Sequence, residues 1–155
     1  MKVIILKENL NNGLNIVNRT AGKNLTLPIL NNILLTTEGS FLNISSTDLE
    51  LGVKYWTLGK IEKNGGLTVP AKTISSFIGL LPEKKIILEV KNQVLYIDCE
   101  SNKTQIKGLP TEEYPIIPKI EDENFIELNI LPFCEGLAQV VDFTAPNQIR
   151  PELSG

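Results

Sequence analysis

The apolar residues change their spacing along the chain, and this change constrains the fold more than any other feature of the sequence. The apolar run Lys2–Leu6 is followed by Leu10, Leu14 and Val17 at helical spacing, and then by short runs separated by turn residues. A period near 3.6 indicates an amphipathic helix, whereas short apolar or alternating runs indicate strands. The sequence therefore predicts a strand, a helix over residues 7–19 and then a group of antiparallel strands.

The same order of elements is predicted a second time. Leu67–Val69 follows a Gly-Gly turn, and Pro70 opens a helix whose apolar stripe is Ile74, Phe77, Ile78 and Leu81 before Pro82 ends it. The strands expected after the two helices are 33–37, 41–45, 49–56, 86–90, 94–99 and 103–107. We therefore expect an α+β fold with antiparallel sheets.

A proline-rich and acidic stretch, residues 109–124, predicts an extended connector. After it, Phe125–Leu128 and residues 129–143 predict a further strand and helix. An offset of 123 positions pairs Leu10 with Phe133, Gly13 with Gly136, Leu14 with Leu137, Val17 with Val140, Pro28 with Pro151 and Leu30 with Leu153. These pairs indicate an internal repeat. We place one domain at residues 1–122 and the start of a second at 123–155, and we expect the chain to be a truncated piece of a longer protein.

The composition excludes several classes of function. The chain has no histidine, which removes the commonest general base and zinc ligand. A formal net charge of −3 argues against a simple basic DNA-coating protein, so any DNA role must depend on how the charges are distributed. The apolar run at the N-terminus is too short for a signal peptide or a membrane span, so we expect a cytoplasmic protein without membrane association.

Several short motifs occur in an order that resembles the bacterial DNA sliding clamps, the beta subunits of DNA polymerase III. They are Thr26–Leu30 (TLPIL), Ser46–Leu51 (STDLEL), Thr68–Lys72 (TVPAK), Gly108–Pro110 (GLP) and Glu113–Pro115 (EYP). The resemblance covers the whole chain. It implies the DNA clamp fold, with antiparallel sheets outside and two helices per domain on the inner face of a ring.

The resemblance also implies a function. Two head-to-tail protomers would encircle duplex DNA without reading its sequence, and would tether the replicative polymerase to its template. The implied protein partners are the DNA polymerase III alpha subunit, the clamp loader and other clamp-binding proteins. Such a processivity factor is an accessory subunit, and it implies no catalytic residue, no cofactor and no metal.

The resemblance also assigns roles to individual residues. The resemblance implies DNA contacts at Lys23, Asn24, Lys72, Asn147 and Gln148. Arg150 and Leu153 would belong to a partial peptide-binding cleft, and Phe77, Leu81 and Lys103 to the subunit interface. The positive side chains Lys7, Arg19 and Lys23 outnumber Glu8 around the first helix, which agrees with a DNA-facing surface. Several of these roles have a purely structural alternative. Lys23 and Asn24 would lie in a solvated loop, Asn147 and Gln148 in an ordinary polar turn after Pro146, which is the favoured interpretation for that pair, and Phe77 and Leu153 at core positions.

Two other classes of function compete with the clamp. One is a stand-alone α+β interaction or oligomerisation module without DNA. The other is a hydrolase that uses Asp48 and Glu50, which share one face if they lie at strand spacing. No phosphate loop or nucleophile motif accompanies these two carboxylates, so a solvated strand edge is the favoured interpretation.

Overall fold

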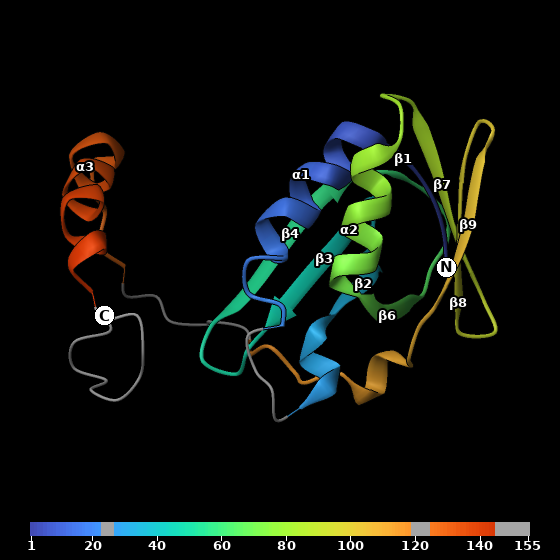
Figure 1. The fold of residues 1–155 in the computed structure, drawn as a ribbon, viewed down its shortest axis with the longest axis horizontal. Coiled ribbons are helices and arrows are strands. Elements are labelled where there is room, and N and C mark those ends of the chain that lie inside the picture. Colours follow the sequence, from blue (N-terminus) through green and yellow to red (C-terminus); the bar gives the residue numbers. More distant parts are fainter. Residues whose placement is uncertain (23–26, 119–124, 145–155) are drawn as a thin grey trace. The chain divides into compact units, whose positions relative to one another are not determined.

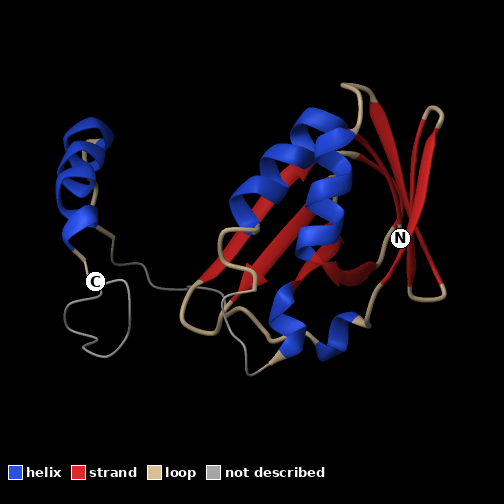
Figure 2. Cartoon of the chain, in the orientation of Figure 1, coloured by secondary structure: helices blue, strands red, loops and turns tan. Residues whose placement is uncertain are grey.

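The computed structural model describes residues 1–22, 27–118 and 125–144 (Figure 1). The chain divides into two compact units, Met1–Pro118 and Lys119–Gly155. Figure 2 shows that the first unit mixes strands and helices, whereas the regular structure described in the second is helical. Among the described residues, no helix has the length and apolar character needed to cross a membrane.

The first unit has the predicted α+β architecture, with one strand that the sequence analysis missed. Its elements are β1 (Lys2–Leu6), α1 (Lys7–Val17), the 3-10 helix η1 (Pro28–Asn31), β2 (Asn32–Glu38), β3 (Phe41–Thr47), β4 (Gly52–Leu58), β5 (Lys60–Lys63), β6 (Gly66–Pro70), α2 (Ala71–Leu80), β7 (Lys85–Lys91), β8 (Val94–Cys99), β9 (Asn102–Lys107) and the 3-10 helix η2 (Thr111–Glu113). The missed strand is β5, whose sequence Lys-Ile-Glu-Lys contains only one apolar residue.

Each of the two sheets contains strands from the first half of the unit (β1–β5) and from its second half (β6–β9). The five-stranded sheet has the order β5-β1-β7-β8-β9, and the four-stranded sheet has the order β4-β3-β2-β6. All strand pairs are antiparallel. The strand before each helix therefore joins the sheet of the other half, because β1 pairs with β7 and β6 pairs with β2. This exchange ties the two halves into one folding unit.

The helices α1 and α2 lie side by side across one face of the four-stranded sheet (Figure 1). Leu10, Leu14 and Val17 of α1 are fully buried, as are Ile74 and Ile78 of α2. Burying such a side chain contributes roughly 1.5–3 kcal/mol relative to leaving it in water. These residues belong to one hydrophobic core that also includes residues of both sheets.

Gly13 lets α1 approach the sheet closely. A Cβ atom at this position would lie 2.6 Å from Cδ1 of Tyr55 on β4 and 2.8 Å from Cδ1 of Ile44 on β3. Both distances are shorter than ordinary van der Waals contact. The glycine is therefore required by the packing of the helix on the sheet.

The turn between β3 and β4 differs from the expected strand. The strand predicted from Leu49 begins only at Gly52, and Leu49 has a φ of 80°, which is uncommon for a residue with a side chain. The carboxylate of Asp48 accepts hydrogen bonds from the backbone N–H groups of Glu50 (3.1 Å) and Leu51 (2.8 Å). Asp48 thus stabilises a turn, and the interpretation of Asp48 and Glu50 as a strand edge is wrong.

The first part of the predicted connector packs on the four-stranded sheet. Leu109 forms an isolated antiparallel bridge with Thr68. Gly108 permits this approach, because a Cβ there would lie 2.3 Å from the carbonyl oxygen of Thr68. Further along, Lys54 Nζ donates a 2.9 Å hydrogen bond to the carbonyl of Ile117. Residues 108–117 are therefore held to the sheet by several separate contacts.

In the second unit, α3 (Ile130–Val140) begins and ends 123 residues after α1, in agreement with the predicted repeat. Asn129 caps it by accepting a hydrogen bond from Leu131 N at 3.3 Å. The 3-10 helix η3 (Val141–Phe143) follows. The prediction of a strand at Phe125–Leu128 is wrong. A strand needs a neighbour for its hydrogen bonds, and the described residues of this unit supply none.

Candidate nucleic-acid interface

The solvent sides of α1 and α2 form a polar surface with few charges, which we call the helical face. Because Leu10, Gly13, Leu14 and Val17 are buried, most of the other positions of α1 face outwards, and several of these are asparagines. The charged residues of the helical face that are exposed are Glu8, Arg19 and Lys72. The face is therefore only slightly positive, within the described part of the chain.

Lys7 does not contribute to this surface, contrary to the expectation from sequence. Its side chain is buried and its Nζ forms an ion pair with Glu83, just before β7. The backbone N–H of Lys7 also donates to the carbonyl of Lys84 at 2.9 Å. Lys7 therefore fixes the first turn of α1 to the start of β7, and its charge is neutralised within the unit.

The predicted DNA contacts are described only in part. Lys72 lies exposed in the first turn of α2, directly after Pro70 and Ala71. Arg19 lies exposed in the turns after α1, on the same two-helix layer. Lys23, Asn24, Asn147, Gln148, Arg150 and Leu153 lie outside the described residues. Of the basic residues around the two helices, the structure thus shows Lys72 and Arg19 exposed, and the sequence analysis named Arg19 only as part of a charge balance.

The residues expected at the subunit interface have different environments. Phe77 on α2 is half-buried and packs against the core, whereas Leu81 is only 6% exposed and belongs to the core itself. Leu80, which the sequence analysis missed, is 87% exposed. The helix ends at Leu80, so Leu81 leaves the helical spiral in extended geometry and turns inwards. Leu80 is the leucine that a second molecule could contact.

Lys103 lies on β9, at the edge of the five-stranded sheet, and forms a 2.7 Å ion pair with Asp98. An ion pair of 3.5 Å between Lys84 and Glu100 joins the segment after α2 to the turn before β9. The end of α2 and the start of β9 therefore lie at the same end of the unit. The open hydrogen-bonding edge of β9 is available to another strand.

Carboxylates, histidines and cysteines do not form a metal-binding group of three or more in the described part of the chain. Cys99 is buried in the core, and burial raises the pKa of its thiol, whereas Cys134 on α3 is exposed. Asp48 is occupied by its turn. The two-helix layer and its flanking edge are thus the candidate interface.

The profile of the family described as "DNA polymerase III beta subunit, N-terminal domain" matches residues 1–118, which cover the whole first unit. The chain belongs to this family. The match agrees with the resemblance drawn from the short motifs.

A curated relative, the beta sliding clamp of Synechocystis, is 27% identical over the whole of this chain and 42% of its own length. The beta sliding clamp of Pseudomonas aeruginosa is 30% identical, again over the whole chain and 43% of its own length. A solved structure of a putative DNA polymerase III beta subunit from Eubacterium rectale has a TM-score of 0.90 and 29% identity, covering 97% of this chain and 41% of that chain. The present chain thus spans about two fifths of the beta-subunit relatives it matches.

Proposed function

We propose that this chain acts, as part of a beta-subunit ring, as a processivity factor of bacterial DNA replication that encircles duplex DNA and tethers the polymerase. The family match over residues 1–118 carries this proposal. In it, residues 1–122 are the first clamp domain and residues 123–155 the beginning of the second. The protein acts in the cytoplasm, without cofactor and without catalytic activity of its own.

The helical face supports the proposal through its chemistry. Arg19 and Lys72 attract phosphates at two points, while the asparagines of α1 offer uncharged hydrogen bonds. Neither kind of contact selects a base sequence. A weakly positive, polar surface therefore suits a ring that must slide, because retention comes from encirclement and not from affinity. Lys23, Asn24, Asn147 and Gln148 are proposed as further phosphate contacts.

Assembly and partner binding complete the proposal. Two protomers join head to tail, with Phe77, Lys103 and the core-anchored Leu81 supporting the surface of the first domain and Leu80 exposed beside them. The partners are double-stranded DNA, the DNA polymerase III alpha subunit, the clamp loader and other clamp-binding proteins. Arg150 and Leu153 are proposed as part of the cleft that receives short peptides of these proteins.

The test uses the full-length protein, its clamp loader and nicked circular duplex DNA. After loading, the protein–DNA mixture is separated by size in high salt, which removes purely electrostatic binding. The proposal expects the protein to remain with the circles and to be released when the circles are cut at one site. Pre-linearised DNA of the same sequence is the matched control.

The opposite outcome is equally specific. If the protein leaves intact circles in high salt and forms no ring-sized dimer in solution, the clamp proposal fails. A stand-alone interaction or oligomerisation module without DNA would then be the better account of the same α+β fold.

A further inference from the structure

The outer face of the five-stranded sheet is rich in lysine and is not covered by another element within residues 1–22 and 27–118. Along each strand, alternate residues point inwards to the core and outwards to solvent. The outward charged side chains define what we call the lysine face: Lys2, Lys60, Glu62, Lys85, Glu89, Lys91, Asp98, Lys103 and Lys107. Lysines outnumber carboxylates on it, although the whole chain has a net charge of −3.

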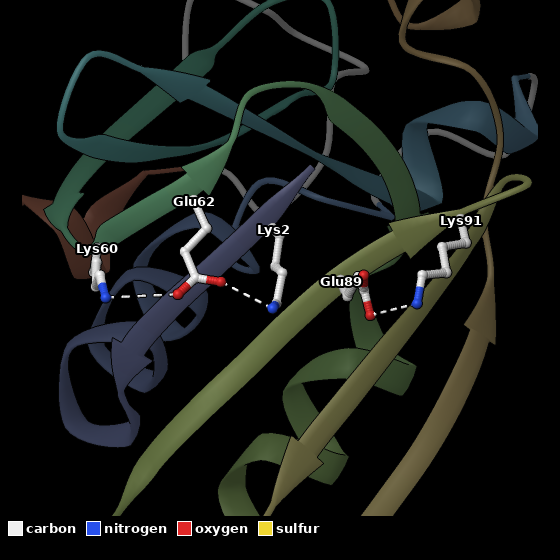
Figure 3. A network of polar contacts seen from close by, with 5 residues as sticks. All are labelled: Lys2, Lys60, Glu62, Glu89 and Lys91. Carbon is white, nitrogen blue, oxygen red and sulfur yellow. Dashed lines mark hydrogen bonds and ion pairs between the residues drawn. The ribbon is translucent and has the colours of Figure 1, made fainter.

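Each carboxylate of the lysine face is already paired with at least one lysine. Figure 3 shows Glu62 with Lys2 and Glu89 with Lys91. The N–O distances of these two ion pairs are 2.8 Å and 2.7 Å. Asp98 pairs with Lys103. The hydrogen bond from Lys2 lowers the pKa of Glu62, and that from Lys91 lowers the pKa of Glu89, so both carboxylates stay ionised near neutral pH.

After this pairing, some lysines at one end of the sheet are not fully neutralised by a carboxylate. Lys60 reaches Glu62 only at 3.6 Å, and Glu62 is already bound by Lys2. Lys85 and Lys107 form no ion pair with any of the described residues. Lys85 stands opposite Leu6 on β1, and Lys60 stands opposite Ile4. Two incompletely neutralised lysines therefore flank the apolar outward positions of β1.

An open groove of about 500 Å³ lies between these two lysines. The residues that matter for binding are Ile4, Leu6, Asn9, Leu58, Lys60 and Lys85, and we call the site the β1–β4 groove. Leu6 is 50% exposed and Leu58 is 63% exposed, and both side chains line this depression. An apolar floor with a positive rim selects a ligand that is both apolar and acidic.

We propose that the β1–β4 groove binds a short acidic segment of a partner protein, with one large apolar side chain inserted between Leu6 and Leu58. Carboxylates on either side of that side chain meet Lys60 and Lys85, and the amide of Asn9 bonds the segment's polar backbone. This site is separate from the helical face and does not depend on the clamp proposal. A nucleic acid fits less well, because the exposed Leu6 and Leu58 side chains match an apolar side chain and not a phosphate.

The test is a peptide selection with the full-length protein. A random peptide library is first depleted on a Leu58→Ser/Lys60→Glu/Lys85→Glu variant and then selected on the wild-type protein. Depletion removes peptides that bind elsewhere. Because all three side chains point into solvent, the variant should fold normally, and matching circular dichroism and thermal unfolding curves check this. Lys107→Glu, on the same face but on β9, is the matched control.

The proposal expects the surviving peptides to combine Asp or Glu with a large apolar residue. It also expects them to bind the triple variant about ten-fold more weakly or worse, and the Lys107→Glu variant almost normally. Two results would overturn it: no peptide that distinguishes wild type from the triple variant, or survivors without acidic residues. A duplex oligonucleotide is measured in parallel, and a matching loss of its binding would assign the groove to nucleic acid instead.

Discussion

The phenol of Tyr114 joins the first part of the connector to the four-stranded sheet at Asn32. Its Oη donates a 3.1 Å hydrogen bond to the carbonyl oxygen of Asn32 on β2 and accepts a 3.2 Å hydrogen bond from the backbone N–H of Thr47 on β3. Tyr114 is only 4% exposed. One side chain thus links the start of β2 to the end of β3.

We therefore expect Tyr114→Phe to destabilise the fold by about 1–3 kcal/mol, because it leaves the buried Asn32 carbonyl and Thr47 N–H without this partner. Urea unfolding of both proteins measures the difference. Tyr96→Phe is the control, since Tyr96 is 40% exposed on the outer face and should change stability by less than about 0.5 kcal/mol. Equal effects of the two substitutions would contradict the role given to Tyr114.

Tyr114 also predicts a pH dependence. Burial raises the pKa of its phenol above the ordinary value of 10.0, while the N–H of Thr47 acts weakly in the other direction. As pH rises, the unfolded chain loses this proton first. The stability that the neutral phenol contributes is therefore fully present below about pH 10 and is lost as pH rises toward the folded-state pKa. Unfolding free energies measured up to about pH 11 should fall more steeply for wild type than for Tyr114→Phe. Parallel curves would count against the prediction.

Packing at Gly13 predicts that Gly13→Ala is destabilising even though alanine favours a helix by about 1 kcal/mol. The added methyl would overlap the Tyr55 ring and the end of Ile44, and such overpacking costs about 1–3 kcal/mol. Gly79→Ala on α2 is the matched control, since no atom lies within 4 Å of a Cβ there. Denaturant unfolding should show opposite signs for the two variants, and a common sign would refute the packing argument.

The helical face predicts a separation between affinity and retention. The measured quantity is the slope of log affinity for linear duplex DNA against log salt concentration. In the full-length protein, Arg19→Ala or Lys72→Ala should reduce this slope by about one. Lys107→Ala, on the opposite side of the unit, should leave the slope unchanged. Retention on circular DNA in high salt should survive all three substitutions. Loss of retention with Lys72→Ala alone would indicate that affinity, and not encirclement, holds the protein.

The end of α2 predicts that two adjacent leucines have different roles. Leu80 is 87% exposed, so Leu80→Ser should leave the unfolding free energy within about 0.5 kcal/mol of wild type. The same substitution should weaken self-association of the full-length protein, because it removes an exposed apolar side chain from the proposed interface. Leu81→Ala should instead cost about 2–5 kcal/mol of stability through a core cavity. Analytical ultracentrifugation and urea unfolding together separate these effects. An unchanged dimer with Leu80→Ser would remove Leu80 from the interface.

The sequence was sufficient for features that depend on neighbours along the chain. The spacing of Leu10, Leu14 and Val17 predicted α1, and the same spacing 123 residues later predicted α3, although both helices end earlier than expected. The alternating runs predicted the strands of both sheets apart from β5, because a half-buried strand repeats every two residues. The short motifs were enough to suggest the family, since their order survives even where each motif alone is weak.

The sequence did not determine which distant residues meet. Only the tertiary structure pairs β1 with β7 and β6 with β2, joins Lys7 to Glu83, and turns Leu81 inwards while leaving Leu80 in solvent. The lysine face likewise depends on strand order, because its side chains come from all five strands of one sheet. Periodicity along a chain shows which side of an element is buried, but the packing of elements decides which charges neutralise each other and which surfaces remain open.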